Sequence, residues 1–286
     1  MPGHVLLTAP DALGIARLQF SHPGKLNALS VQMWRDLRDL LDRLNATPPE
    51  QAPRVVVVQG DGGQFVAGAD IEEFPDFRFD AATLAHYHEE VVAPALNALL
   101  DCELPLVAEI QGACVGGGLE IAACCDIRVC GQGSRFGVPI ARLGFPMAPL
   151  EVEIVARVVG EAVLRELLLE ARVLAAEEAQ RLGLVNRVVP DGQVADEARR
   201  TAERMAALSP QALRLNKRAL REFGRAQGSR WEQRAPHYAY APTDEHREGL
   251  AAFNERRPAR FAAPSPTPAT APDGDTPPAP SPAPAP

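Results

Sequence analysis

Continuous apolar runs alternate along the first half of the chain with stretches that repeat at helical spacing. Residues 54–59 read Arg-Val-Val-Val-Val-Gln, and residues 104–110 are mostly apolar. Such runs are typical of parallel strands that are buried on both faces. Trp34, Leu37 and Leu41 share one face of a helix between the first strands. The alternation of strand, helix and strand therefore predicts an α/β protein with a largely parallel sheet and right-handed crossovers.

The two ends of this pattern differ from its middle. Residues 5–8 and 14–20 predict two short strands in a hairpin-like start. From residue 150 onward the pattern becomes helical, and only residues 185–189 predict a strand. The expected helices span residues 151–159, 161–170, 175–182, 193–208, 210–223 and 242–255. Because little sheet is left for their apolar stripes to cover, we expect these helices to pack on the body or on a second copy of the chain.

Length and composition are ordinary for a soluble globular protein. The chain has 286 residues, 46% hydrophobic and 23% charged, enough to bury a substantial core in one large domain with or without an appendage. No run of eighteen apolar residues and no basic-then-apolar N-terminus occurs, so we expect no membrane span, no signal peptide and a cytoplasmic location.

Charge is unevenly distributed along the chain. The net charge is −8, but residues 195–260 contain fourteen basic and nine acidic residues, a local charge of +5, so the rest carries −13. A basic C-terminal segment in an acidic protein fits a phosphorylated small ligand better than a nucleic acid, which would favour a dense basic patch with interleaved aromatic residues. Ordinary solvated helix faces are the alternative for any single arginine.

Five cysteines fall within 29 residues, at positions 102, 114, 124, 125 and 130. They form no Cys-x-x-Cys pair with a nearby histidine, and a single cluster is not a disulfide framework. We expect reduced core cysteines and no metal site.

A glycine-rich turn carries the first chemical signal. The apolar run 104–110 is followed by Gly116, Gly117 and Gly118, which open a helix containing Glu120. Glycines let backbone N–H groups approach a ligand closely, and the first N–H groups of a helix lack intrahelical partners, so a developing negative charge is favoured there. A carboxylate at Glu120 could act as a base beside such a site. On the glycines alone, a tight turn or a close packing point is an equal alternative, and Glu120 alone reads as a solvated helix residue.

A second stretch joins the first. After the valine run come residues 60–63, Gly-Asp-Gly-Gly, and residues 65–71, Phe-Val-Ala-Gly-Ala-Asp-Ile. Together with the glycine turn, this loop resembles the enoyl-CoA hydratase/isomerase family, the crotonase superfamily. The resemblance covers roughly residues 5–261 and continues through residues 25–29, 125–128, 136–139, 179–185 and 248–253.

The resemblance implies an organisation of the whole chain. Residues 1–190 would form a crotonase-like spiral of ββα repeats, and residues 191–261 a C-terminal helical region for assembly and active-site cover. Family members are usually trimers or paired trimers, so a homotrimer or a dimer of trimers is implied. Residues 262–286 hold ten of the 27 prolines, and this Pro/Ala-rich tail is expected to be extended and disordered.

The resemblance also implies a site for an acyl-CoA thioester, with coenzyme A as part of the substrate and no separate cofactor. The backbone N–H groups of Ala69 and Gly117 would form the oxyanion hole, with Glu120 as general acid/base. Residues 70–88 would shape the acyl pocket; His86 and His88 there lie two apart, face different sides of a helix and cannot jointly bind a metal, although one could face the substrate. The residues implied to contact the substrate are Lys25, Leu26, Ala28, Ala67, Gly68, Asp70, Ile71, Gly116 and Ile140.

One position departs from the family pattern. Family hydratases place a second glutamate directly after Phe-Gly-x-Pro, where this chain has Ile140, and the usual Pro-Gly-x-Gly-Gly is replaced by residues 145–151, Phe-Pro-Met-Ala-Pro-Leu-Glu. A lost acid–base group costs roughly 10² to 10⁴ in rate, whereas Ile140 leaves both backbone donors untouched. Glu151 is the preferred substitute, because it opens the helix expected to line the pocket.

The sequence thus favours an acyl-CoA enzyme that stabilises an enolate-like intermediate, most simply by hydrating a 2-enoyl-CoA. Isomerisation, decarboxylation or thioester hydrolysis in the same oxyanion hole is the first alternative. A non-catalytic CoA-thioester-binding homologue is the second; Ile140 favours it and Glu120 argues against it.

Overall fold

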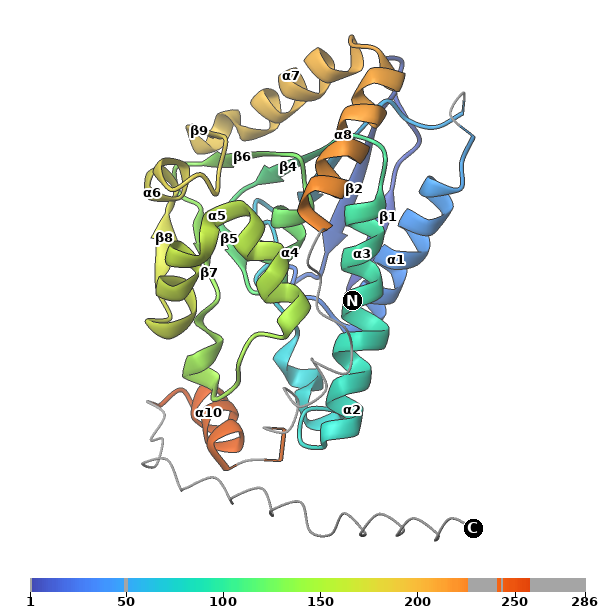
Figure 1. Cartoon of the computed structure of the whole chain (residues 1–286). Coiled ribbons are helices and arrows are strands. Elements are labelled where there is room, and N and C mark those ends of the chain that lie inside the picture. The colour runs from blue at the N-terminus through green and yellow to red at the C-terminus, as the bar shows by residue number, and fades with distance from the viewer. Residues whose placement is uncertain (1, 49–50, 226–240, 243, 258–286) are drawn as a thin grey trace, which may run out of the picture.

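The computed structural model describes residues 2–48, 51–225, 241–242 and 244–257. In this part of the chain a central sheet is enclosed by helices, and the N-terminal strands lie beside the middle of the chain (Figure 1). The Pro-rich tail expected at residues 262–286 lies outside the described residues, so its predicted disorder stays a prediction.

Six strands form the central sheet in the order β1-β2-β3-β4-β6-β9. β1 is antiparallel to β2, and every other neighbouring pair in this sheet is parallel. The largely parallel α/β sheet and the hairpin-like start predicted from the sequence are confirmed. The strands span His4–Leu7 (β1), Ile15–Ser21 (β2), Val55–Gly60 (β3), Leu106–Ile110 (β4), Ile127–Gly131 (β6) and Arg187–Val189 (β9).

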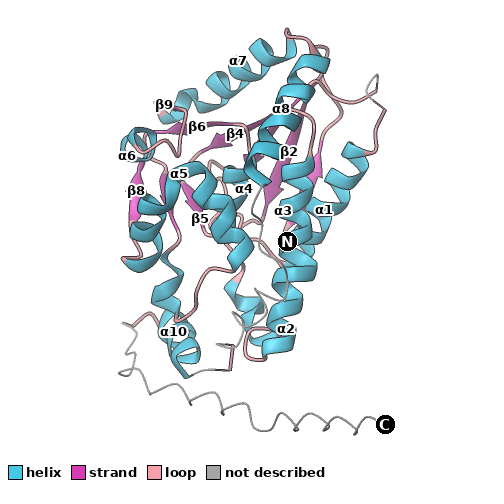
Figure 2. Cartoon of the chain, viewed as in Figure 1, coloured by secondary structure: helices cyan, strands magenta, loops and turns pink. Residues whose placement is uncertain are grey.

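The valine run of β3 is buried on both faces of this sheet. Its odd-numbered valines pack against α7 (Val194–Ala206), and its even-numbered valines join the main core with α1 (Val31–Asn45) and α3 (Ala93–Asp101). All four valines are at most 1% exposed. Successive side chains of a strand point to opposite faces, so a central strand between two helical layers needs apolar residues at every position. Figure 2 shows these strands enclosed by helices.

A second sheet of three short strands lies beside the first. It has the order β5-β7-β8, with strands at Ala113–Val115, Arg135–Gly137 and Val173–Ala175. The expectation that only residues 185–189 form a strand after residue 150 was wrong, because β8 pairs antiparallel with β7. Strands of three residues are too short to show an alternating pattern, and their pairing partners lie far away in the sequence.

The helical segments carry two breaks that have local causes. α2 (Ala81–His86) and α3 are separated by a π-helical turn, η2 (Tyr87–Val92), which ends just before Pro94 in the first turn of α3. α5 is interrupted at Gly160, whose φ of 75° lies in the left-handed region that favours glycine. The interruption falls between the two helices predicted over residues 151–159 and 161–170. No helix in the described ranges has the length and apolar composition needed to cross a membrane. The remaining segments are η1 (Ile71–Asp76), α2 (Ala81–His86), η2 (Tyr87–Val92), α4 (Gly117–Cys124), η3 (Pro139–Leu143), α5 (Pro149–Leu169), α6 (Ala176–Arg181), η4 (Asp191–Gln193), α8 (Pro210–Arg225) and α10 (Asp244–Asn254).

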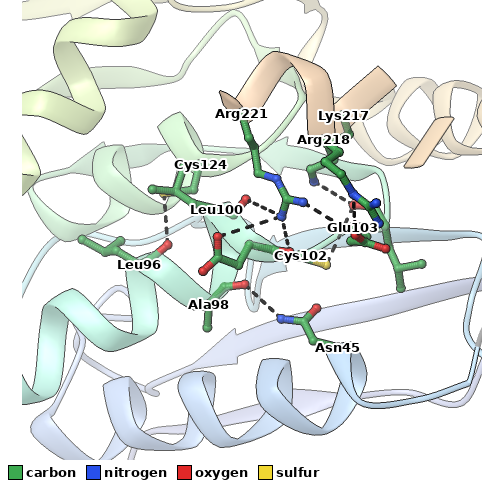
Figure 3. Close-up of polar contacts among 12 residues, drawn as sticks. Asn45, Leu96, Ala98, Leu100, Cys102, Glu103, Cys124, Lys217, Arg218 and Arg221 are labelled. Carbon is green, nitrogen blue, oxygen red and sulfur yellow. Dashed lines mark hydrogen bonds and ion pairs between the residues drawn. The ribbon is translucent and has the colours of Figure 1, made fainter. Parts of the chain in front are cut away.

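Basic side chains of α8 dock this helix on the loop between α3 and β4 (Figure 3). Lys217 is buried, and its Nζ donates to the carbonyl oxygen of Leu104 and to Oδ2 of Asp126, both at 2.7 Å. Arg221 donates to the carbonyl of Leu100 at 3.3 Å. Part of the positive charge that the sequence suggested for a phosphorylated ligand is therefore used in intramolecular docking.

Replacing Lys217 by Met should destabilise the protein by roughly 1–3 kcal/mol, because the Leu104 carbonyl loses a buried charged donor. Arg218→Met provides the control, since Arg218 is half-exposed and pairs with Glu103 at the surface, where an ion pair contributes about 1 kcal/mol or less. Urea unfolding of both variants checks this; equal losses would contradict the docking role of Lys217.

Candidate active site

One cavity of about 520 Å³ collects every site residue that the sequence nominated. Segments far apart in the sequence supply its walls: the loop before α1, the loop before η1 with η1 itself, η2, the start of α4, and η3 with the start of α5. Phe253 of α10 also lines it. The nominated residues on the lining are Lys25, Leu26, Ala28, Ala67, Gly68, Ala69, Asp70, Ile71, Gly116, Gly117, Glu120, Ile140 and Glu151.

The backbone N–H of Ala69 is directed away from its neighbouring chain segment. Leu29 accepts a hydrogen bond from Asp70 N and donates one to Gly68 O, both at 2.8 Å. Successive backbone groups in extended chain point to opposite sides, so the N–H of Ala69 between them faces away from Leu29. This N–H has no hydrogen-bond acceptor among the described residues.

Gly117 supplies the second backbone N–H, as the first residue of α4. Gly116 before it has a φ of 51°, which lets the chain turn from β5 into the helix. A Cβ on Gly117 would lie 2.9 Å from Cζ2 of Trp34, so the turn is closely packed. The N–H of Gly117 has no acceptor among the described residues, and it lies at the positive end of the helix.

Glu120 is buried one helical turn further along α4, at 6% exposure. Burial raises its pKa well above the ordinary value, the charge of Glu151 raises it further, and the guanidinium of Arg78 opposes both. These surroundings favour the protonated form of Glu120 over that of an ordinary glutamate, and in that form it can donate a proton.

Glu151 lies in the first turn of α5 and is also buried, at 5% exposure. Its Oε1 accepts a hydrogen bond from Nδ1 of His88 at 2.6 Å, and its Oε2 accepts one from Ala148 N at 3.2 Å. Burial raises the pKa of Glu151, but His88, the Ala148 N–H and Arg78 together outweigh it and hold the pKa below the ordinary value. The pKa values of two carboxyl groups in one cavity are thus displaced in opposite directions, which is the pattern of acid–base pairs.

Arg78 is a cavity residue that the sequence did not reveal. It is 3% exposed, and its guanidinium carbon lies 4.2 Å from the ring centroid of Phe74 and 4.1 Å from that of Phe145. Such stacking orients a guanidinium and favours its charge. No motif spacing marks this arginine, because its partners come from η1, α4 and α5.

The side chains of His86 and His88 point to different sides of the helical segment, as their spacing predicted. His86 is exposed, whereas His88 is buried and lines the cavity. Helical spacing could separate the two side chains but could not tell which one faces inward.

Lys25 and Asp70 form a polar contact at the cavity wall. Nζ of Lys25 donates to Oδ2 of Asp70 at 2.6 Å and to Oε2 of Glu72 at 2.8 Å, and these bonds raise its pKa. Asp70 also accepts the N–H of Glu72 at the start of η1. Lys25 was expected to contact the substrate. Because two carboxylates already bind its ammonium group, these contacts also fix the loop.

Ile140 lies half-buried on η3 and belongs to the apolar wall of the cavity. α10 closes this wall, since Leu250 packs with Phe74 and Phe145. Gly249 lies so near η3 that an added Cβ would come within 2.0 Å of the Leu143 backbone. α10 therefore lies directly against η3 and the apolar wall of the cavity.

The described part of the chain contains no group of three or more His, Cys, Asp or Glu that could hold a metal ion. All five cysteines are buried, and none pairs with another in a disulfide. The prediction that they are core residues is confirmed.

Glu120→Gln and Glu151→Gln should change stability with opposite pH dependence. Because the folded state raises the pKa of Glu120, the contribution of this carboxyl group to folding stability is fully present below about pH 4.5. That contribution is lost as the pH rises through the pKa of the folded state. Glu120→Gln should therefore gain melting temperature relative to the parent as pH rises above about 4.5.

The lowered pKa of Glu151 gives the opposite pH dependence. The contribution of its carboxylate to folding stability is present above about pH 4.5 and is lost as the pH falls through the pKa of the folded state. Glu151→Gln should be less stable than the parent near neutral pH, with the difference closing in acid. Melting curves across pH check both variants, and parallel dependences would contradict the assignment of charge.

Comparison with known proteins agrees with this geometry. A family model for enoyl-CoA hydratase/isomerase matches residues 11–264. A Mycobacterium tuberculosis protein named "Probable enoyl-CoA hydratase" is 32% identical over 260 residues, covering 90% of this chain and 97% of its own length. A crotonyl-CoA hydratase from Syntrophomonas wolfei is 31% identical over 262 residues, with 90% and 97% coverage.

A solved structure gives the same result for the fold. The enoyl-CoA hydratase/carnithine racemase from Magnetospirillum magneticum is 37% identical, with a TM-score of 0.74 and coverage of 91% of this chain and 96% of that one. The resemblance inferred from the glycine turn and the Ala69 loop is confirmed: the chain is an enzyme of the enoyl-CoA hydratase/isomerase family, the crotonase superfamily.

Proposed function

We propose that the protein hydrates a 2-enoyl-CoA thioester, with Glu120 and Glu151 as its acid–base pair. The observation that carries this proposal is the second buried carboxylate: Glu151 lines the same cavity as Glu120, and its charge raises the pKa of Glu120. Hydration requires two groups that handle protons on one water and one carbon. Glu151 meets that requirement although Ile140 cannot.

The thioester carbonyl oxygen is bound by the N–H groups of Ala69 and Gly117. When water adds to C3, the electrons of the C2–C3 double bond move towards this oxygen and give an enolate-like intermediate. Two preorganised N–H donors stabilise that charge, and each such donor is typically worth roughly 10² to 10³ in rate. The positive end of α4 adds to the same effect.

The two glutamates divide the proton transfers according to their charge. Ionised Glu151 accepts a proton from the water as its oxygen bonds to C3, and protonated Glu120 delivers a proton to C2. One water is consumed, and the product is a 3-hydroxyacyl-CoA. Return of the proton from Glu151 to Glu120 through solvent restores the starting state.

The names of relatives support this choice of reaction. The Syntrophomonas wolfei relative is named for crotonyl-CoA, a short 2-enoyl-CoA, and the Mycobacterium tuberculosis relative for enoyl-CoA hydration. The retained charge difference between the two glutamates argues against a non-catalytic binder, since a binding site would gain nothing from burying two carboxyl groups.

Glu120→Gln and Glu151→Gln should each lower the turnover of crotonyl-CoA by roughly 10² to 10⁴, because each removes one proton-transfer group. Affinity for saturated butyryl-CoA should stay within about threefold, since neither variant alters the oxyanion donors. Turnover is measured by the loss of absorbance of the conjugated enoyl thioester, and affinity is measured by calorimetry. A Glu151→Gln variant with parental turnover would reject this pair.

Ile140→Glu tests whether the two positions are interchangeable. In the Glu151→Gln background, a glutamate at position 140 restores a second carboxylate to the cavity, and we expect hydration to recover by about tenfold or more. In the parent it adds a third carboxyl group, and burial beside two others should keep it protonated and turnover unimproved. A gain in the parent with no rescue of the double variant would contradict the role of Glu151.

We also propose that the protein assembles as a homotrimer or a dimer of trimers. Large apolar side chains at its surface support this, with Leu169 at 77%, Leu215 at 53% and Leu220 at 73% exposure. Sedimentation at micromolar concentration should give a trimer or hexamer, and Leu220→Asp should weaken it. A parent that sediments only as a monomer would contradict assembly.

A further inference from the structure

His88 is a side chain from another segment of the cavity lining that holds Glu151. It lies on η2, 63 residues before its partner, and both side chains are 7% exposed. Since an ionised carboxylate can only accept, Nδ1 of His88 carries the hydrogen in the 2.6 Å contact with Oε1. The Tyr87 ring meets the imidazole edge-on, with centroids 5.1 Å apart.

This contact leaves little freedom to the Glu151 carboxylate. Oε1 is held by His88 and Oε2 by the N–H of Ala148, so the two oxygens are fixed by different elements, η2 and the start of α5. A proton-transfer group needs its oxygen within hydrogen-bond reach of the water in a fixed orientation. Support of this kind is what holds a reacting side chain in its productive geometry.

We propose that His88 is a positioning residue, which holds Glu151 as the proton acceptor for water while Glu120 delivers the proton to carbon. This inference rests on the proposed hydration. It assigns the imidazole a role in which it donates one fixed hydrogen bond and never contacts the reacting atoms.

The charged groups around Glu151 determine what the loss of His88 would do. Arg78 and the Ala148 N–H lower the pKa of Glu151, whereas its burial raises it most strongly. Glu120 on α4 and Tyr87 on η2 are the other titratable groups coupled to it. Without the imidazole, burial has less opposition, so protonation of Glu151 should occur at higher pH and the acidic limb of kcat/KM should shift upward.

His88→Leu tests the inference, with His88→Asn and His86→Asn as matched variants. His88→Leu should lower kcat for crotonyl-CoA by about 10- to 1000-fold and shift the acidic limb to higher pH. Its KM and its affinity for butyryl-CoA should stay within about threefold of the parent. His88→Asn keeps an N–H near the position of Nδ1 and should retain at least about a tenth of parental kcat with an unshifted limb. His86→Asn, on the exposed side of the same segment, should match the parent.

Three results would overturn the role of His88 while leaving hydration intact: parental kcat in His88→Leu, an unshifted acidic limb in that variant, or equal loss in His88→Asn and His88→Leu. A parent that hydrates no enoyl-CoA would instead reject the proposed function, and this inference with it.

A second measurement does not depend on whether the His88 variants fold. In the parent labelled with ¹⁵N-histidine, the Nδ1 proton of His88 should give a strongly deshielded resonance that exchanges slowly with water. Glu151→Gln should move that resonance upfield, whereas Glu120→Gln should leave it present. An Nδ1 of the parent without a bound proton would overturn the inference directly.

Discussion

Two carboxyl groups buried in one largely apolar cavity cannot both carry a charge without a large cost, and this constraint organises the site. Removing an ionised carboxylate from water is unfavourable unless partners replace its hydration. Glu151 has such partners in His88, the Ala148 N–H and the nearby charge of Arg78. Glu120 is buried beside that charge, and both effects raise its pKa and favour its protonated form. The division into donor and acceptor follows from this difference in surroundings.

The fold supplies those surroundings from separate elements. The second sheet fixes both the glycine turn before α4, which follows β5, and the chain that leads from β7 into η3. η2 brings His88 into contact with Glu151 in the first turn of α5. The proposed pair places its second carboxylate at this helix start, eleven residues after Ile140, where the backbone N–H of Ala148 also donates to it.

The sequence predicted the parts that depend on local chemistry. The valine run is apolar at successive positions because both faces of β3 are covered, and Gly116 to Gly118 mark a turn that only small residues permit. The nominated residues other than Glu151 meet at one cavity because they lie at positions of family motifs with a fixed place in the fold. Glu151 could be nominated because the position after residue 139 was occupied by isoleucine.

What the sequence could not reveal depends on contacts between distant segments. Arg78 has no motif, and its position between Phe74 and Phe145 joins η1 to the loop before α5. His88 could be separated from His86 by helical spacing, but its partner lies 63 residues away. The strands β5, β7 and β8 have three residues each, too few for a periodic pattern, and they are defined by their pairing alone.

The most direct test of the central claim is incubation of crotonyl-CoA with the parent protein in ¹⁸O-labelled water, followed by mass analysis of the intact thioester. The account predicts a 3-hydroxybutyryl-CoA that carries one labelled oxygen on its acyl chain, with no loss of coenzyme A. Free coenzyme A with label in a released carboxylic acid, or an unchanged thioester, would contradict it.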